Sequence, residues 1–282
     1  MKSGTRLEKA IEAMGERTGL EFSDLFSNFL DLSLTLLCNN PSDHQKKLME
    51  ATLANDKRKA AFCEALKAYG DAAEGYHDPL GDMFMTRISF GHNGQFFTPD
   101  PVCEFMARIS DPKGETVNDP CCGSGRLLLA TLKVARENGE DPIIYANDLS
   151  YTCSQMCLMN LLFNSARGEV SCGDALRMNL ESFRFFRIDR LMLPDGKWMA
   201  TYWQYTLANV DEVDKQRNEW RKKMLESGVW VEVIRNNVTE DAEIVPKEAE
   251  NVPEVAEIVP DEPQYDHLTA TPKAVQLELE LF

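Results

Sequence analysis

The residues best suited to chemistry are a glycine-rich turn and the acidic residues that follow two later apolar segments. Gly123 and Gly125 lie in Asp119-Pro-Cys-Cys-Gly-Ser-Gly125, and Asp148 and Asp174 come after apolar segments further along the chain. A glycine turn before a helix lets backbone amides approach a ligand closely, and a carboxylate after the next strand can accept ribose hydroxyls. This spacing predicts a crevice for a nucleotide-like ligand.

Alternating strands and helices are expected to hold these residues in place. The predicted strands cover 116–118, 143–146 and 169–172, and the predicted helices between them cover 126–137 and 151–164. Such alternation is typical of an α/β fold with a parallel sheet and right-handed crossovers. The carboxyl ends of parallel strands meet at one edge, so the three acidic residues should converge there. No further strand is predicted after this point, and we expect an abbreviated sheet.

Each signal has a more ordinary interpretation when taken alone. Gly-x-Gly turns occur by chance, and an aspartate after a strand is more often a helix cap than a ligand contact. Their order and spacing favour the binding site. A nicotinamide dinucleotide is disfavoured because Leu128 occupies the position of the third glycine in that fingerprint.

The segments on either side of the predicted sheet differ from it in composition. Residues 1–77 carry apolar residues at three- and four-residue steps, which predicts an N-terminal helical region. Residues 236–275 form a linker rich in Pro, Glu and Val, in which Ala-Glu-Ile-Val-Pro occurs twice, and such a linker is expected to be disordered. Residues 237–282 hold 12 acidic and 2 basic side chains, so most of the net charge of -16 lies there. The acidity of the whole chain therefore does not exclude DNA as a partner of the domain 78–235.

The eight cysteines are expected to be reduced, because they fall in apolar or motif segments of a chain without a predicted secretory signal. Cys153 and Cys157 share one helical face, but no further ligands accompany them, so we predict buried core residues and no metal site. The apolar run 29–38 is too short to cross a bilayer. We predict a cytoplasmic protein without a membrane segment.

The chain resembles the N6-adenine DNA methyltransferases on two motifs, Gly94-Gln-Phe-Phe-Thr-Pro99 and the turn from Asp119 to Gly125. The resemblance covers about 78–176 and is strongest to modification subunits of type I restriction systems and to related single-chain phage and plasmid proteins. It implies a Rossmann-like methyltransferase sheet with S-adenosylmethionine as cofactor. It also implies DNA, and a specificity or second methyltransferase subunit, as partners.

The resemblance further implies a role for each matching residue. Asp119 would bind the methionine amino group, Asp148 the ribose, and Asp174 the exocyclic amine of the cofactor's adenine, while Gly123 allows close approach. The remaining residues implied as cofactor contacts lie in the two motifs: Phe97, Thr98, Pro99, Pro120, Cys121 and Gly125.

The chain departs from this family at the site of catalysis. The family's Asn/Asp-Pro-Pro-aromatic loop, which holds the flipped adenine, occurs nowhere in the sequence. The nearest segment is Leu193-Pro-Asp-Gly196, whose ordinary interpretation is a turn at the end of a strand. Our main hypothesis is an adenine-N6 DNA methyltransferase-like protein in which an unrecognised loop within 191–203, or a partner, replaces the tetrapeptide. The alternatives are a non-catalytic regulatory or accessory module tethered to a replication or restriction complex, and a small-molecule or protein methyltransferase.

Two further groups of residues are candidates for contact with nucleic acid. Aromatic residues at 198, 202, 203 and 205 are expected to be core, with base stacking as the alternative. A predicted helix over 211–226 carries cations that would either contact phosphates or line a solvated face: Arg217, Arg221, Lys222 and Lys223.

The final segment, Gln276-Leu-Glu-Leu-Glu-Leu-Phe282, resembles bacterial sliding-clamp-binding peptides of the form Gln-Leu-x-Leu-x-Leu. The contacts that this implies are Gln276, Leu277, Leu279, Leu281 and Phe282. Strict alternation is equally typical of a segment that pairs with an edge of the protein's own sheet. Both interpretations stay open at this stage.

Overall fold

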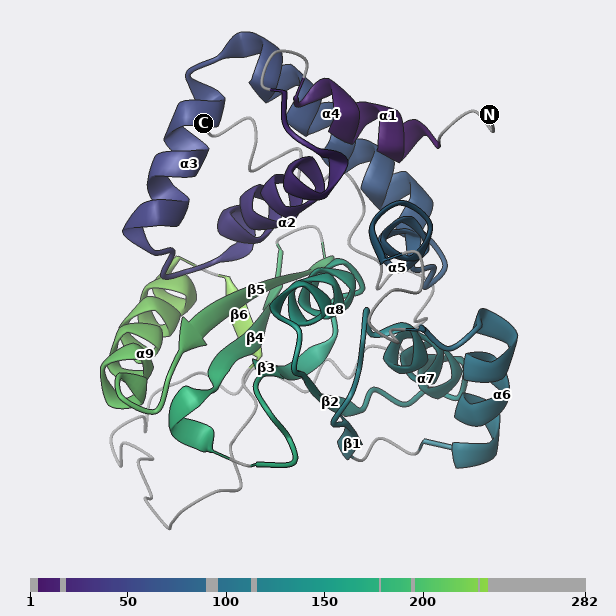
Figure 1. Ribbon diagram of the computed structural model, residues 1–282. Coiled ribbons are helices and arrows are strands. Elements are labelled where there is room, and N and C mark those ends of the chain that lie inside the picture. The colour runs from purple at the N-terminus through teal and green to yellow at the C-terminus, as the bar shows by residue number, and fades with distance from the viewer. Residues whose placement is uncertain are drawn as a thin grey trace.

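The computed structural model describes residues 5–15, 19–89, 96–112, 116–177, 179–193, 196–227 and 229–232. Helices dominate the first part of the chain, as the apolar periodicity predicts (Figure 1). They are α1 (Arg6–Ala13), α2 (Phe22–Leu37), α3 (Asp43–Leu53), α4 (Asp56–Ala73) and α5 (Pro79–Phe84), followed by a π-helical turn at Met85–Ser89. Side-chain caps begin several of these helices, including the capping boxes of Thr5 with Glu8 and Ser42 with Gln45.

The second part of the chain alternates between helices and strands. Its helices are α6 (Asp100–Ser110), α7 (Arg126–Glu137), α8 (Tyr151–Phe163) and α9 (Val210–Glu226). Its strands are β1 (Thr116–Asp119), β2 (Ile143–Asp148), β3 (Arg167–Cys172), β4 (Arg184–Met192), β5 (Trp198–Tyr205) and β6 (Trp230–Glu232). The predicted helices and strands as far as residue 172 all form, with boundaries shifted by at most two residues.

Within the described residues the sheet has the order β1-β2-β3-β4-β5, and β6 also pairs with β4. The strands β1, β2 and β3 run parallel to one another, as expected from their helical crossovers. By contrast, β4 is antiparallel to β3 and to β5. The sheet is therefore mixed, and its second half is a hairpin that the sequence pattern did not predict.

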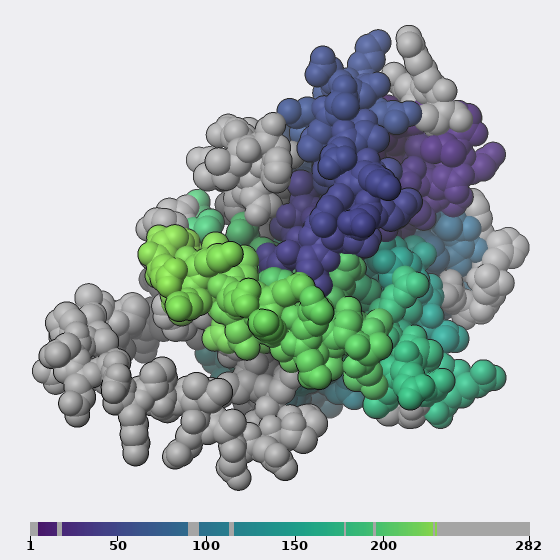
Figure 2. All heavy atoms as spheres, turned by 90° about the vertical axis from the view of Figure 1, so that its left-hand side faces the viewer, coloured from purple at the N-terminus to yellow at the C-terminus, as the bar shows by residue number. Residues whose placement is uncertain are grey.

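The sheet separates two unequal layers of helices. On one face α8 covers β2, β3 and β5, and α2 packs beside α8 (Figure 1). The main hydrophobic core lies in this layer and extends from Leu7 in α1 to Tyr202 in β5. A smaller cluster of Trp203, Tyr205 and Val213 lies on the opposite face, beneath α9. Figure 2 shows α9, in green, as a long ridge on the surface beside the blue α3.

The main core joins the N-terminal helices to the sheet. Tyr69 of α4 is completely buried and packs edge-on against Phe163 of α8, with ring centroids 4.6 Å apart. Its hydroxyl donates a hydrogen bond to Oδ1 of Asn160. The predicted boundary between residues 77 and 78 thus lies within one continuous hydrophobic cluster. None of the described helices is long and apolar enough to cross a membrane. The predicted linker and the final segment lie outside the described residues.

Candidate cofactor site

The carboxyl ends of β1, β2 and β3 lie side by side, as the sequence predicts. Asp119 pairs with Ala146, and Asp148 pairs with Cys172, so the two acidic residues end neighbouring strands. The side chain of Asn147 donates hydrogen bonds to the carbonyls of Pro120 and Gly173, at 3.2 and 3.0 Å. One buried amide therefore ties the loop after β1 to the loop after β3.

Asp148 shapes the glycine turn directly. Its Oδ2 accepts a hydrogen bond from the amide of Gly123 at 2.8 Å, and its Oδ1 accepts one from the amide of Ser150 at 2.8 Å. These bonds fix both oxygens at the rim of the crevice and leave each with further accepting capacity. Asp148 is thus held in the position where a carboxylate can accept ribose hydroxyls.

Asp119, like Asp148, is partly buried. Its Oδ1 accepts a hydrogen bond from the amide of Cys121 at 3.1 Å, and its Oδ2 has no partner among the described residues. Burial raises the pKa of Asp119 above its ordinary value, the Cys121 amide opposes this shift, and the charge of Asp148 adds to it. A cationic group placed beside Asp119 would stabilise its ionised form.

Gly123 brings the two predicted motifs into contact. Its backbone has φ of +57°, and a Cβ at this position would lie 2.9 Å from the ring of Phe97. Phe97 in turn stacks on Phe84, with ring centroids 5.8 Å apart. Only glycine fits here without strain, because both the conformation and the neighbouring ring exclude a side chain. The segment that contains Phe97, Thr98 and Pro99 therefore lies against the turn that follows β1.

A buried polar network holds the turn from the other side. The side chain of Asp78 is 1% exposed and accepts hydrogen bonds from Ser124 Oγ at 2.5 Å and from Asn160 Nδ2 at 2.8 Å. It also forms an ion pair with Arg126, the first residue of α7, whose Nε lies 3.1 Å from Oδ2 of Asp78. Asp78 caps α5 as well, by accepting a bond from the amide of Gly81. The network joins α5, the glycine turn, α7 and α8 into one support.

Asp174 and two exposed leucines lie in the loops that follow β2 and β3. Asp174 Oδ1 accepts hydrogen bonds from the amides of Leu176 and Arg177, so the acidic residue shapes its own loop. Leu149, directly after Asp148, is 72% exposed, and Leu176 is 97% exposed. Neither these leucines nor Asn147 were predicted from the sequence. The available signal for Leu149 was its position directly after a strand-end acid, at the edge of the sheet where ligands of such folds bind.

Comparison with known proteins places the chain in a family. The model of the N-6 DNA Methylase family matches residues 78–227, just over half of the chain. The chain belongs to this family. The match begins at Asp78, the residue that anchors the glycine turn. Membership makes the chain DNA methyltransferase-like and related to restriction-modification systems, and it makes S-adenosylmethionine the cofactor.

Individual relatives agree with this assignment. The chain is 30% identical over 165 residues to the type I restriction enzyme MpnII methylase subunit of Mycoplasma pneumoniae, a match that covers 56% of this chain and 29% of the relative. It is 26% identical over 138 residues to the MjaIX methylase subunit of Methanocaldococcus jannaschii, covering 48% and 21%. The chain thus spans less than a third of the length of these relatives.

One solved structure with a related name is a type I restriction-modification methyltransferase subunit from Streptococcus thermophilus. It is 20% identical, with a TM-score of 0.34, and the match covers 62% of this chain and 40% of that chain.

The segment proposed to replace the family's base-binding loop lies far from the cofactor crevice. Because Cys172 pairs with Arg184, β4 begins at the carboxyl end of β3 and runs away from it over its nine residues, roughly 25 Å. The turn from Leu193 to Lys197 is closed by backbone hydrogen bonds at the opposite end of the sheet. The described residues of 191–203 are mostly strand and lie away from the carboxyl end of β3. A catalytic loop in this range stays a prediction that the position of these residues does not support.

The predicted nucleic-acid contacts of α9 divide into two groups. Arg217 is 6% exposed and forms a two-pronged pair with Asp189 of β4, with Nε 2.8 Å from Oδ2. It is not available to a phosphate, and that prediction is wrong. Arg221 is partly buried, while Lys222 and Lys223 are exposed and stay predicted contacts. Tyr202, Trp203 and Tyr205 are core residues, as expected, and Cys153 and Cys157 are buried.

The sliding-clamp prediction concerns residues 276–282, which lie outside the described part of the chain. Clamp binding therefore stays a prediction. Gly94, in the first motif, also lies outside it.

Proposed function

We propose that the chain is the S-adenosylmethionine-binding component of an adenine-N6 DNA modification system and does not itself hold the target adenine. The observation that carries this proposal is the position of the β4–β5 turn. A methyl group bound at the carboxyl ends of β1–β3 and a base held by residues 193–197 would lie at opposite ends of one sheet. Leu193, Gly196 and Lys197, the described residues of this turn, are therefore too far from the methyl group to hold the base beside it.

The chain's own residues fit the cofactor. Asp148 offers two fixed carboxylate oxygens to the ribose, and Asp119 offers an unshared oxygen to the ammonium of the methionine part. Gly123 leaves space for close approach beside Phe97. Leu149 and Leu176 supply exposed apolar surface for the faces of the adenine ring. When bound, S-adenosylmethionine supplies the methyl group.

The remaining predicted contacts fit the same crevice. Asp174, in the loop after β3, would accept a hydrogen bond from the adenine amine of the cofactor, and Thr98 is exposed next to Phe97 in the chain. Pro120, Cys121 and Gly125 contribute backbone to the turn. Transfer to DNA would then require another polypeptide, such as a specificity subunit or a second methyltransferase subunit, to hold the flipped base. A regulatory module that binds the cofactor without catalysis is the alternative.

The test combines cofactor binding with methyl transfer by the purified chain. We expect the wild type to bind labelled S-adenosylmethionine and to transfer no label to unmethylated DNA. Asp119→Ala should lose binding, whereas Asp211→Ala, an exposed acid on α9, should retain it. Label in DNA adenine that disappears with Asp119→Ala would show that the chain holds the base itself. Absence of cofactor binding by the folded wild type would contradict the binding role.

A further inference from the structure

The outer edge of β1 has no partner strand among the described residues. β1 pairs with β2 along its whole length, from Thr116 with Ile143 to Asp119 with Ala146, and it ends the strand order. Thr116 and Asn118 are exposed. Proteins generally cover such an edge or protect it with charges, because unpaired backbone groups invite pairing with other strands. The edge of β1 lacks a lysine or proline within the strand.

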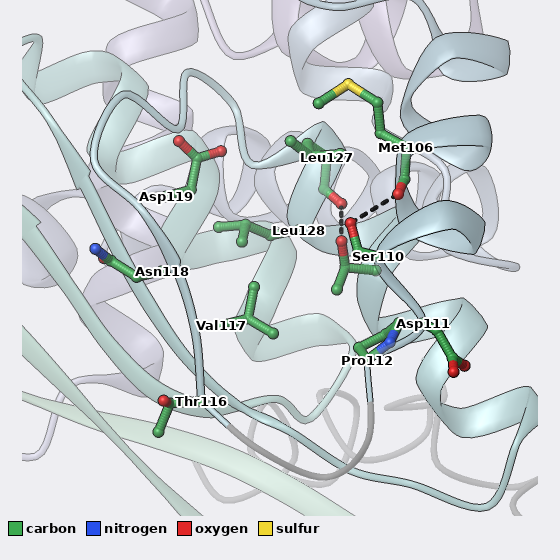
Figure 3. Close-up of a pocket in the computed structure, with 11 residues that line it drawn as sticks. Met106, Ser110, Asp111, Pro112, Thr116, Val117, Asn118, Asp119, Leu127 and Leu128 are labelled. Carbon is green, nitrogen blue, oxygen red and sulfur yellow. Dashed lines mark hydrogen bonds between the residues drawn. The ribbon is translucent and has the colours of Figure 1, made fainter.

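A groove of about 430 Å³ runs along this edge (Figure 3). Its apolar wall comes from Met106 of α6, from Val117, and from Leu127 and Leu128 of α7. The two hydroxyls in the wall already donate hydrogen bonds within their own helices. Ser110 Oγ donates to the carbonyl of Met106, and Thr131 Oγ1 donates to the carbonyl of Leu127, both at 2.8 Å. The groove therefore favours apolar side chains on the side that faces the helices.

The two faces of the edge have different chemistry. Val117 lies beside Ile144, which is fully buried, so the side chain of Val117 faces the helix layer. Thr116 and Asn118 alternate with it and lie on the other, exposed face. A strand that added to this edge would need apolar residues toward α6 and α7 and polar residues toward solvent.

The final segment of the chain has this alternation. In Val275-Gln-Leu-Glu-Leu-Glu-Leu-Phe282, apolar residues at 275, 277, 279 and 281 alternate with Gln276, Glu278 and Glu280. Seven residues of such a pattern are long enough to cover the four residues of β1. Addition of an extended segment to a sheet edge gains main-chain hydrogen bonds, and pockets for alternate side chains set its register.

We propose that residues 275–282 add to the outer edge of β1 as an intramolecular strand. Leu277, Leu279 and Leu281 pack into the groove, against Val117 and the leucines of α7. Glu278 and Glu280 face solvent on the side of Thr116 and Asn118. The strand occupies the place beside β1 where the sheet of a doubly wound fold continues past its switch point.

The connecting segment is long enough to allow this pairing within one molecule. Glu232, the last described residue, pairs with Arg190, and Gly168 at the start of β3 pairs with Ile188, so β6 ends beside the start of β3. At this end of the sheet the start of β1 lies two strands from the start of β3, a distance of about 10 Å. About forty residues separate Glu232 from the proposed strand, and a flexible chain of that length would have a root-mean-square reach of roughly 35 Å.

Hydrogen exchange of the β1 amides tests the proposal. In the full chain, we expect the outward-facing amides of 116–119 to exchange at least about tenfold more slowly than in a chain that ends at residue 274. A synthetic peptide of residues 275–282 should restore the protection to the shortened chain. Leu279→Asp in the full chain should remove it, whereas the matched change Glu278→Gln should not.

Three results would overturn the proposal. Equal exchange of β1 in the full and shortened chains, both folded by circular dichroism, would show that the segment does not cover the edge. Protection that disappears on dilution would assign the edge to a second copy of the chain. Equal protection in the Leu279→Asp and Glu278→Gln variants would show that the leucines do not face the groove.

Discussion

The strand ends of β1, β2 and β3 and the β4–β5 hairpin belong to one sheet, but different interactions build them. The strand ends are held by local elements: a glycine turn, an amide that bridges neighbouring loops, and Asp148 bonded to the turn. The hairpin is held by buried charges that come from distant segments, such as Arg217 on Asp189 and Arg187 on Glu169 and Asp214.

The two regions also differ in what they can contribute to function. The first region holds the residues that the family motifs imply as cofactor contacts, and at Gly123 the backbone conformation and the ring of Phe97 exclude a side chain. The second region includes residues 191–203, for which the sequence suggested a base-binding loop. Its turn lies at the end of the sheet opposite to the cofactor region. Changes in the two regions should therefore have separable effects on cofactor binding.

The largest expected effect is the loss of Asp78. Asp78→Ala removes the buried acceptor that Ser124, Asn160 and Arg126 share, which should destabilise the protein by about 4 kcal/mol and weaken cofactor binding. Urea unfolding measures the first effect. The matched control is Asp82→Ala, because Asp82 also pairs with Arg126 but is 69% exposed, and its loss should cost under about 1 kcal/mol. Equal losses in both variants would contradict the role of the network.

The hairpin should respond to the loss of Arg217. Arg217→Ala leaves Asp189, whose side chain is fully buried, without its partner and should destabilise the protein by about 3 kcal/mol. Lys222→Ala on the same helix should change stability by less than about 0.5 kcal/mol. The Arg217→Ala variant should keep its cofactor affinity at temperatures where it is folded. A selective loss of cofactor affinity in the folded variant would show that the two regions are coupled.

Alanine at two glycines with positive φ compares the regions directly. Gly123→Ala strains the backbone and meets the ring of Phe97, so it should cost about 2 kcal/mol and reduce cofactor affinity. In Gly196→Ala, in the β4–β5 turn, the added Cβ would have no neighbour within 4 Å, but φ is +78°. This variant should lose about 1 kcal/mol of stability, with no change in cofactor affinity. Calorimetric titration with S-adenosylmethionine distinguishes them. A similar loss of affinity in both would remove the basis for the comparison.

The smallest expected effect is on pH dependence. Burial raises the pKa of Asp119, so its protonated form favours the folded state below the ordinary value of 3.8, and this contribution is lost as the pH rises through the raised pKa. A bound ammonium needs the ionised form, so cofactor affinity should increase as the pH rises through the same range. Asp119→Asn should flatten this dependence. An unchanged profile in the variant would show that Asp119 does not pair with the cofactor.

The local character of the cofactor site explains why the sequence predicted it. Gly123 and Asp148 lie within segments whose spacing alone indicates strand, turn and helix, and their roles need only neighbouring residues. Asn147 was missed because its bonds to the loops after β1 and β3 depend on which strands are adjacent. The order of those strands is a property of the assembled sheet.

The hairpin was not predicted because its strand pattern contains charges. Arg187, Asp189 and Arg190 interrupt the apolar alternation of β4, although all three are buried. Their partners, among them Arg217 on α9 and Asp141 before β2, are far away in the sequence. A buried charge is stable only when it is paired, and the pairing is invisible until the fold is known.

The most direct test of this account is to map where the cofactor binds. Labelled S-adenosylmethionine would be cross-linked to the wild-type chain by ultraviolet light, and the labelled peptides would be identified. We expect the label in the peptides that contain Cys121–Gly125 and Leu149, with loss of label in Asp148→Ala and retention in Gly196→Ala. Label concentrated in the peptides of the β4–β5 hairpin would contradict the division of the molecule into a cofactor region and a hairpin without a catalytic role.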